Sequence, residues 1–495
     1  MNFSVRTWRA LAIFGIAALA GSSILASGYV LLDGGHGSAG DGARSVAVTG
    51  QRLLRAFGAI GDGRADDTVA LQKAFDTAAG QCLDGEGRTF LVSGSLRAGS
   101  DLCLKHVRIV QAPARSTTRA FIAGACAMTV DPEAVIDCHD APVASRDTEA
   151  LRTYTQTRTL FIRPTRSGAA LRVDLQDVTI NRGDDPHSGS RADAAGIWIE
   201  NATEVLLDTV TITGAGKGYG LMIAHSRNVM VRGLYIHDLV WAPYDGDTPL
   251  SLARVQQEGW NRPMVRELRP SLKGGKGFGF GGTRVQEQLV GLMIAGSRQV
   301  TLRDTRIDGC QARFAEGDVP WQADGINISQ DSRDVSIEGD TLVRNTWEGI
   351  DIAGTGTGAG ASNLRITGAS ITDSFAFGVK LGHRLTDVRI RDTKISGAGL
   401  AGVVLYGPID GIVLESLRLD MADRRRTPLA EWPATKVGIL IDRSGEGVPR
   451  NLRFSDIAVS GGGSCTAGVQ DRAGARPEIA DLRISGCAAR YATSD

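Results

Sequence analysis

The sequence predicts an all-β fold, a single parallel β-helix (solenoid) with an N-terminal helical cap, and three observations support it. A Gly-apolar-x-apolar segment recurs from about residue 170 to the C-terminus. A second alternating segment, preceded by a turn-forming residue, follows the copies. Some copies start 24 residues apart, as Gly325 and Gly349 do, and likewise Gly378 and Gly402. This spacing suits one coil, is too short for a propeller blade, and leaves no room for the helix of a leucine-rich repeat.

Each recurring segment is expected to form one strand that stacks on its counterpart in the next coil. The segments read GIWI at Gly196, GLMI at Gly220 and Gly291, GINI at Gly325, GIDI at Gly349, GVKL at Gly378, GVVL at Gly402 and GILI at Gly438. Their apolar positions would fill one long core. The 63 glycines beside only 15 prolines indicate many tight turns rather than a disordered tract.

The first 50 residues are expected to lie outside the fold. Residues 1–32 combine arginines near the start, an apolar run and an A-x-A pattern at Ala18-Leu19-Ala20, which is typical of a secretory signal peptide. The apolar run is also long enough for an uncleaved membrane anchor. Residues 33–50 read as a linker, and residues 51–495 as the β-helix. Either alternative predicts export, to the periplasm, to the medium or to the membrane surface that faces the periplasm.

Charge and cysteines limit the partners and the compartment. Lys and Arg together number 55, as do Asp and Glu, so nothing predicts a nucleic-acid partner. In an oxidising compartment the seven cysteines suggest three disulfides and one unpaired thiol. The predicted pairs are Cys82/Cys103, Cys126/Cys138 and Cys465/Cys487, which leaves Cys310 unpaired. No second His/Cys pair stands at zinc spacing, and we assign no metal ligand.

Residues 57–80, FGAIGDGRADDTVALQKAFDTAAG, predict the helical cap, with the helix around residues 66–79. Asp66 or Asp67 can cap its N-terminus, and Gly80 can stop it. Its apolar face is expected to contain Leu71, Ala74, Phe75 and Ala78. This segment closely resembles the opening segment of the pectate-lyase-like, right-handed β-helix superfamily, which includes glycoside hydrolase family 28. The resemblance implies a right-handed β-helix and a polysaccharide substrate.

Polar residues interrupt the outward positions of the strands only in the middle of the chain. Two residues after each glycine stand Asn327, Asp351 and Lys380, where other copies carry mostly apolar residues. Just before the glycine stand Asp324 and Glu348 on the same coils. Since neighbouring strands lie about 4.8 Å apart, these side chains are expected to meet. Asp324, Glu348, Asp351 and Lys380 are therefore the predicted catalytic residues; the alternative is a solvent-facing ladder of ion pairs.

Residues beside this cluster are candidates for substrate binding. Asn327 belongs to the same column, and Trp321 and Trp347 precede the strands that carry Asp324 and Asp351. Tryptophan rings can stack on sugars. His383 and Arg384 follow Lys380 and can hold a substrate carboxylate. A long insertion at about 240–285, rich in aromatic residues, is predicted to form a flap.

The reaction stays open among several alternatives. An eliminating lyase needs a base and a cation, for which Lys380 and Arg384 are the candidates; the superfamily uses Lys or Arg this way, with or without Ca²⁺ held by acids. No other cofactor is indicated. In a hydrolase resembling family 28, Asp324 and Glu348 match two of its acids, whereas its histidine and Arg-x-Lys are not in place.

Two further classes follow. A C5-epimerase is third. DDPHSG at 184–189 resembles the Asp-Pro-His-Asp motif of mannuronan C5-epimerases, but Ser188 stands in place of the final Asp, and we interpret the stretch as a turn. A non-catalytic exopolysaccharide-binding or assembly protein is the alternative outside enzymes. Our first expectation is an exported enzyme of lyase type that cleaves an acidic, uronate-containing polysaccharide.

Overall fold

The structure is a computed structural model that describes most of the body of the chain. The described residues are 50–78, 80–112, 128–131, 134–136, 158–184, 195–216, 218–241, 244–245, 248–249, 289–315, 317–319, 323–353, 360–422, 436–443 and 447–493. The predicted signal or anchor, the linker, the Cys126/Cys138 pair, Trp321 and most of the insertion at 240–285 lie outside them. Within these ranges no helix is long and apolar enough to span a membrane.

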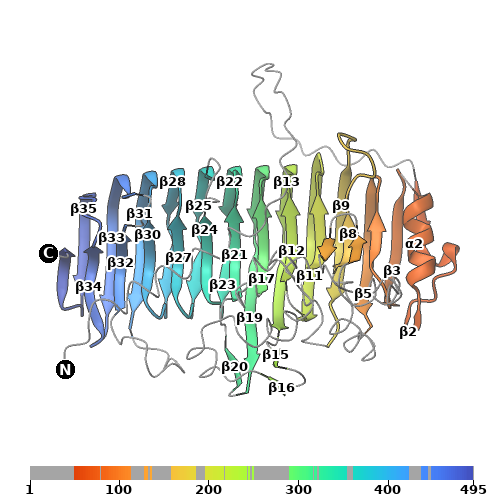
Figure 1. Cartoon of the computed structure of the whole chain (residues 1–495), viewed down its shortest axis with the longest axis horizontal. Coiled ribbons are helices and arrows are strands. Elements are labelled where there is room, and N and C mark those ends of the chain that lie inside the picture. The colour runs from red at the N-terminus through yellow and green to blue at the C-terminus, as the bar shows by residue number, and fades with distance from the viewer. Residues whose placement is uncertain are drawn as a thin grey trace.

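Among the described residues, the eight Gly-apolar-x-apolar segments lie in one continuous sheet of twelve strands along the molecule (Figure 1). In spatial order its strands are β4 (Leu96–Ala98), β8 (Arg158–Ile162), β10 (Ala195–Glu200), β12 (Gly218–Ala224), β17 (Leu289–Ala295), β21 (Ala323–Ser329), β24 (Glu348–Ala353), β27 (Phe377–Gly382), β30 (Ala401–Tyr406), β32 (Lys436–Asp442), β34 (Cys465–Asp471) and β36 (Ala489–Thr493). Every strand pairs in parallel with the next coil's strand, as the repeat predicted.

A second sheet of twenty strands closes the remaining sides of the coils. Its strands are β1 (Gln51–Leu53), β2 (Asp62–Asp66), β3 (Cys82–Val92), β5 (Leu102–Gln111), β9 (Arg172–Asn181), β11 (Glu204–Ala215), β13 (Arg227–Arg232), β14 (Tyr235–Trp241), β18 (Arg298–Arg303), β19 (Arg306–Phe314), β20 (Gly317–Val319), β22 (Arg333–Glu338), β23 (Leu342–Arg344), β25 (Ser362–Thr367), β26 (Ser370–Thr372), β28 (Thr386–Arg391), β29 (Lys394–Ser396), β31 (Asp410–Met421), β33 (Arg450–Gly461) and β35 (Glu478–Ser485). Two small pairs, β6 (Met128–Asp131) with β7 (Ala134–Ile136) and β15 (Tyr244–Asp245) with β16 (Thr248–Pro249), stand apart.

The recurring glycine is required by the close approach of consecutive coils. A Cβ atom on Gly325 would lie 2.5 Å from the carbonyl oxygen of Gly349, and one on Gly349 would lie 2.5 Å from that of Gly378. Such distances are shorter than any ordinary contact, so a side chain there would push the coils apart. The glycines therefore fix the register that carries every outward side chain from coil to coil.

The N-terminal end of the solenoid is covered by the predicted cap. The short helix η2 (Leu54–Phe57) precedes α2 (Thr68–Thr77), which packs against β3 and β4. All four residues of its expected apolar face are buried. Asp67 occupies the N-cap position, but its carboxylate accepts the backbone N–H groups of Ile60 and Gly61, at 2.7 and 3.0 Å. Asp66 instead accepts the backbone N–H of Thr68.

The core runs through the whole solenoid, and serines line one corner of it. Leu, Ile and Val from both sheets form one buried cluster from Leu54 to Leu482. At the corner after the twelve-stranded sheet, the backbone N–H of Ser226 donates to Oγ of Ser297 at 3.1 Å, and that of Ser297 donates to Oγ of Ser332 at 3.3 Å. These hydroxyl groups accept hydrogen bonds from backbone N–H groups that would otherwise be buried without an acceptor.

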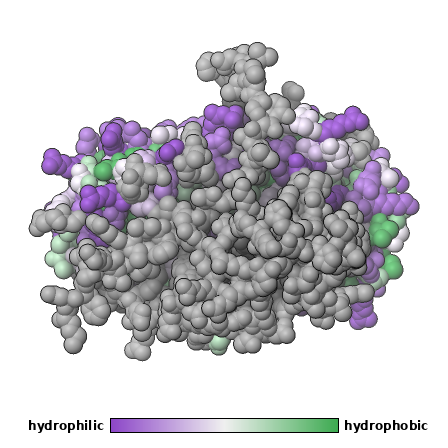
Figure 2. Space-filling model, in the orientation of Figure 1, coloured by the Kyte–Doolittle hydropathy of each residue, from purple (hydrophilic) through white to green (hydrophobic). Residues whose placement is uncertain are grey.

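Disulfides close the coils near both ends. The predicted pairs Cys82–Cys103 and Cys465–Cys487 are confirmed, and Cys310 is a free, buried thiol. Among the described residues, the exposed large hydrophobic side chains are Ile60, Val69 and Tyr491, in the cap and in the last strand. Elsewhere the described surface in view is mostly hydrophilic (Figure 2). Most large apolar side chains of the described residues are therefore buried, and the exposed ones lie at the two ends of the solenoid.

Candidate active site

Three neighbouring strands place the predicted catalytic side chains together. Asp324 and Asn327 lie on β21, Glu348 and Asp351 on β24, and Lys380 on β27. Asn327 pairs with Asp351, and Asp351 pairs with Lys380, in the parallel register. We call these five residues the polar cluster. The register predicted from the glycines is therefore the one that the structure adopts.

Lys380 is the centre of the contacts within the polar cluster. Its Nζ atom donates to Oε2 of Glu348 at 2.9 Å and to Oδ2 of Asp351 at 3.2 Å. Nδ2 of Asn327 also donates to Oδ2 of Asp351, at 3.3 Å. The backbone N–H of Glu348 donates to Oδ1 of Asp324 at 3.3 Å. One ammonium group thus pairs with two carboxylates, and Asp324 accepts hydrogen bonds from the Glu348 backbone and from the Asn327 side chain.

The polar cluster is largely removed from solvent. Asn327, Glu348 and Asp351 are each 4% exposed, and the Lys380 side chain is 12% exposed. Asp324 is the half-buried member. Burying charges costs free energy that pairing only partly offsets, so an ordinary surface ladder would leave them in water. The burial argues against the solvent-facing alternative that the sequence left open.

Burial and mutual repulsion shift the protonation of the carboxylates. Burial, reinforced by the charge of Asp351, raises the pKa of Asp324 to about 7. Burial also raises the pKa of Glu348 well above its usual value, although Lys380 opposes this. Burial disfavours the Lys380 ammonium, but Asp351, Glu348 and Asp324 outweigh it, and the pKa of Lys380 is raised. The result is a charged Lys380 near Asp324, a carboxyl group that exchanges its proton near neutral pH.

The three carboxylates also have the chemistry of a site for a hard cation. Asp324, Glu348 and Asp351 each bring one oxygen within 4.8 Å of the others. Oδ1 of Asp351 is buried and, within the described part of the chain, accepts no hydrogen bond. Oxygen ligands of this kind suit Ca²⁺, as the superfamily resemblance allows. A cation bound there would have to compete with the Lys380 ammonium for two of the three carboxylates.

The remaining predicted binding residues take different places. Trp347 is 7% exposed and stacks on Phe375, with ring centroids 4.9 Å apart, as part of the main core. It does not offer a ring face to a sugar, and we do not retain that role. His383 is buried with its ring edge-on to Tyr406, whereas Arg384 is exposed in the turn after β27.

A family model described as "Right handed beta helix region" matches residues 172–395. The chain is a right-handed β-helix. Its resemblance to the pectate-lyase-like superfamily, inferred from the cap segment, is confirmed in the fold. No curated protein sequence matches this β-helix.

Solved structures of similar shape come from proteins of different roles. The A-module of the mannuronan C-5 epimerase AlgE6 from Azotobacter vinelandii has a TM-score of 0.56 and 16% identity, over 89% of this chain and 97% of that one. PfbA, a surface adhesin of Streptococcus pneumoniae, has a TM-score of 0.48 and 14% identity, over 90% and 92%. The periplasmic alginate epimerase AlgG has a TM-score of 0.41 and 10% identity, over 84% and 76%. Identities this low show the fold alone.

The polar surface of the N-terminal coils of this β-helix was not predicted from the sequence. On the outward face of β8 and β10, the guanidinium of Arg158 lies 4.3 Å from the ring centroid of Phe161 and 4.0 Å from that of Trp198. Next to them, arginines gather where the coils turn. A signal was present, because Ser-Arg occurs at 226–227, 297–298 and 332–333, each time at the start of the second strand of a coil.

Proposed function

We propose that this β-helix is an exported enzyme that cleaves a polysaccharide at the polar cluster. The observation that carries the proposal is the burial of Glu348 and Asp351 against Lys380, with the half-buried Asp324 beside them, in columns that are mostly apolar on the other coils. Buried ionisable groups with shifted pKa values concentrate at functional sites, because a purely structural role would be filled more cheaply by apolar side chains.

Asp324 is the proposed proton donor and acceptor. Its pKa of about 7 matches the operating pH of an extracellular enzyme, and it is the least buried carboxylate of the polar cluster. A group that is half protonated near neutral pH can give a proton to the glycosidic oxygen of a leaving sugar. Glu348 and Asp351, held by Lys380, supply the second carboxylate that glycosidic hydrolysis requires.

The contacts of Lys380 weigh against elimination with a lysine base, the reaction that the sequence suggested first. A lysine base must lose its proton near neutral pH, and two carboxylates in direct contact stabilise its charged form instead. Hydrolysis by Asp324 and Glu348 is therefore the reaction that the geometry supports best.

The substrate class and compartment are part of the proposal. The similar AlgE6 module is, by its name, an enzyme of mannuronan, and we extend to this chain the polysaccharide class but not the reaction. Two disulfides support a location outside the reducing cytoplasm.

The experiment incubates the full chain with a panel of acidic polysaccharides. It follows reducing ends, the ultraviolet absorbance of unsaturated uronates, and exchange of the C5 proton by NMR. We expect reducing ends without the absorbance, and no product from Asp324→Asn. Absorbance rising together with the ends would replace hydrolysis by elimination, and proton exchange without cleavage would replace it by epimerisation. Binding without any of these changes would mean a non-catalytic protein.

A further inference from the structure

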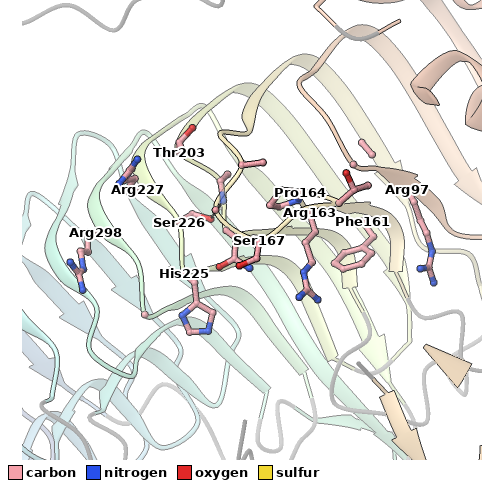
Figure 3. A pocket seen from close by; sticks show the side chains of 18 of the residues that line it. Arg97, Phe161, Arg163, Pro164, Ser167, Thr203, His225, Ser226, Arg227 and Arg298 are labelled. Atoms are coloured by element: carbon pink, nitrogen blue, oxygen red, sulfur yellow. Dashed lines mark hydrogen bonds between the residues drawn. The ribbon is translucent and has the colours of Figure 1, made fainter. Parts of the chain in front are cut away.

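A groove of about 920 Å³ lies in the N-terminal coils, away from the polar cluster (Figure 3). It runs along the turns that follow β4, β8, β10, β12 and β17, beside the cap helix α2. Its charged lining contains four arginines, Arg97, Arg163, Arg227 and Arg298, against two aspartates, Asp76 and Asp331. We call it the arginine groove. It is positive although the chain as a whole carries no net charge.

Two of these arginines are set side by side by the coil register. Arg227 begins β13 and Arg298 begins β18, and the two positions pair directly in the parallel sheet. Arg333 of β22 extends the same row by one coil. Like charges directly opposite each other on neighbouring strands are destabilising. The row therefore gains stability from any anion that lies along it.

Two arginines of this row have no carboxylate partner within the described ranges. Both Arg227 and Arg298 are exposed, and neither forms an ion pair there. By contrast, exposed arginines of the same sheet pair with the next coil, as Arg303 does with Glu338 at 2.6 Å. At the other end of the groove Arg163 lies 4.0 Å from Glu200, and Arg97 lies over the ring of Phe161.

The turn just before Arg298 contains a glycine, Gly296, whose lack of a side chain leaves space in the groove wall. His225, Gly296 and Gln330 occupy equivalent left-handed positions of consecutive turns, with φ of 49°, 56° and 58°. A Cβ atom on Gly296 would lie 2.5 Å from Nδ1 of His225. Glycine at 296 thus makes room for the His225 ring, which Figure 3 shows projecting from the groove wall. An additional hydrogen-bonding group is thereby placed beside the arginines.

We propose that the arginine groove binds the carboxylate groups of an anionic polysaccharide. Guanidinium groups match carboxylates by paired N–H donors, and a row of them repeated at the strand spacing suits a ligand that carries many anions. That the ligand is a polymer rests on the proposed function. The groove also separates two tasks: it attracts the negative chain, whereas the polar cluster, itself rich in carboxylates, performs the bond cleavage.

The test compares two double variants of the full chain by calorimetric titration. Arg227→Ala with Arg298→Ala removes the exposed arginines of the groove. Arg389→Ala with Arg453→Ala removes two exposed arginines of the same sheet near the other end, and serves as the matched control. The probes are polygalacturonate, alginate and carboxyl-reduced polygalacturonate, each at low and at moderate salt. The groove variant should bind the two polyuronates at least tenfold more weakly than the parent and with a smaller salt dependence.

The neutral, carboxyl-reduced probe should not distinguish the parent from either double variant. Unchanged polyuronate affinity in the groove variant, or an equal loss in the control variant, overturns the proposal. The failure of the proposed function would look different, because Asp324→Asn would then bind and turn over polymer like the parent. Loss of polyuronate affinity in the groove variant, with no cleavage by the parent, would leave the groove established and the enzyme activity refuted.

Discussion

Nζ of Lys380 lies 2.9 Å from Oε2 of Glu348, although the two residues belong to different outward columns of neighbouring coils. This diagonal contact, together with that to Asp351, ties β24 to β27 outside the core. A buried charge that loses its only cation is strongly destabilising. The polar cluster is therefore a part of the fold as well as the proposed reaction centre, and substitutions separate the two roles.

Replacing Asp324 by Asn tests the reaction alone. Asp324 has no contact with the Lys380 ammonium among the described ion pairs, so its amide should fold like the parent. Loss of a general acid or base typically lowers the rate by about 10²–10⁴-fold. We expect this loss in kcat with an unchanged circular dichroism spectrum. Val404→Ala, in the same column as Lys380 on the next coil, should retain activity.

Removing the charge of Lys380 should instead weaken the fold. Lys380→Met leaves Glu348 and Asp351 buried without their cation, which typically costs about 3–5 kcal/mol. Chemical denaturation at neutral pH measures the change. The control is Lys394→Met on β29, an exposed lysine, for which a change within about 0.5 kcal/mol is expected. If the two variants unfold alike, the polar cluster contributes no such coupling.

Activity and stability should both change with pH because of Asp324. With a pKa of about 7 against 3.8 for an unperturbed group, the folded chain keeps a proton that the unfolded chain loses. Its contribution to stability is therefore complete below about pH 4 and decreases as the pH rises toward 7. The difference in the free energy of unfolding between the parent and Asp324→Asn should show this slope.

A general acid must also be protonated to act. The kcat of the parent should accordingly decrease as the pH rises above about 7. A profile that is flat from pH 5 to 9 would exclude Asp324 as the proton donor.

The C-terminal disulfide should matter because it joins the start of β34 to the chain just before β36, the last strand of the described sheet. Cys465 and Cys487 are 22 residues apart, and a loop of this size constrains the unfolded chain by about 3 kcal/mol. The double variant Cys465→Ala with Cys487→Ala should unfold at a lower temperature than the parent. Cys310→Ala, at the buried free thiol, is the comparison that changes a cysteine without breaking a disulfide.

The buried serines allow a test of the corner. In Ser297→Ala the backbone N–H of Ser226 loses its acceptor, and an unsatisfied buried donor costs about 1–3 kcal/mol. Ser370→Ala, at a partly exposed position of β26, should be close to neutral. Equal unfolding free energies of the two variants would mean that the corner hydroxyls are dispensable.

The fold and the composition of the polar cluster could be predicted because both follow from one periodicity. Glycine every coil sets the register, and the register alone brings Asn327, Asp351 and Lys380 side by side. Periodicity gives no measure of how deeply a side chain is covered. The burial of Glu348, and hence its shifted pKa, was therefore not predictable from the sequence.

Turn residues were harder to interpret than strand residues. Trp347 lies in a turn before a strand, where the pattern does not tell whether a ring faces the core, and it stacks on Phe375. Arg227 and Arg298 begin the second, alternating segment of their coils, a pattern that predicts a strand and no site. The two arginines are 71 residues apart in sequence because their coil carries a long insertion. Only the pairing of β13 with β18 in the structure shows that they are neighbours.

The stacking of coils also fixes a length. Three strand steps, from β12 through β17 and β21 to β24, separate the His225 turn from Asp351, or about 14 Å at the usual strand spacing. Adding or removing one whole coil would change this span by about 4.8 Å and leave both ends intact. A solenoid of this kind sets distances in discrete steps, so duplicating one coil would change the span between the arginine groove and the polar cluster without redesigning either.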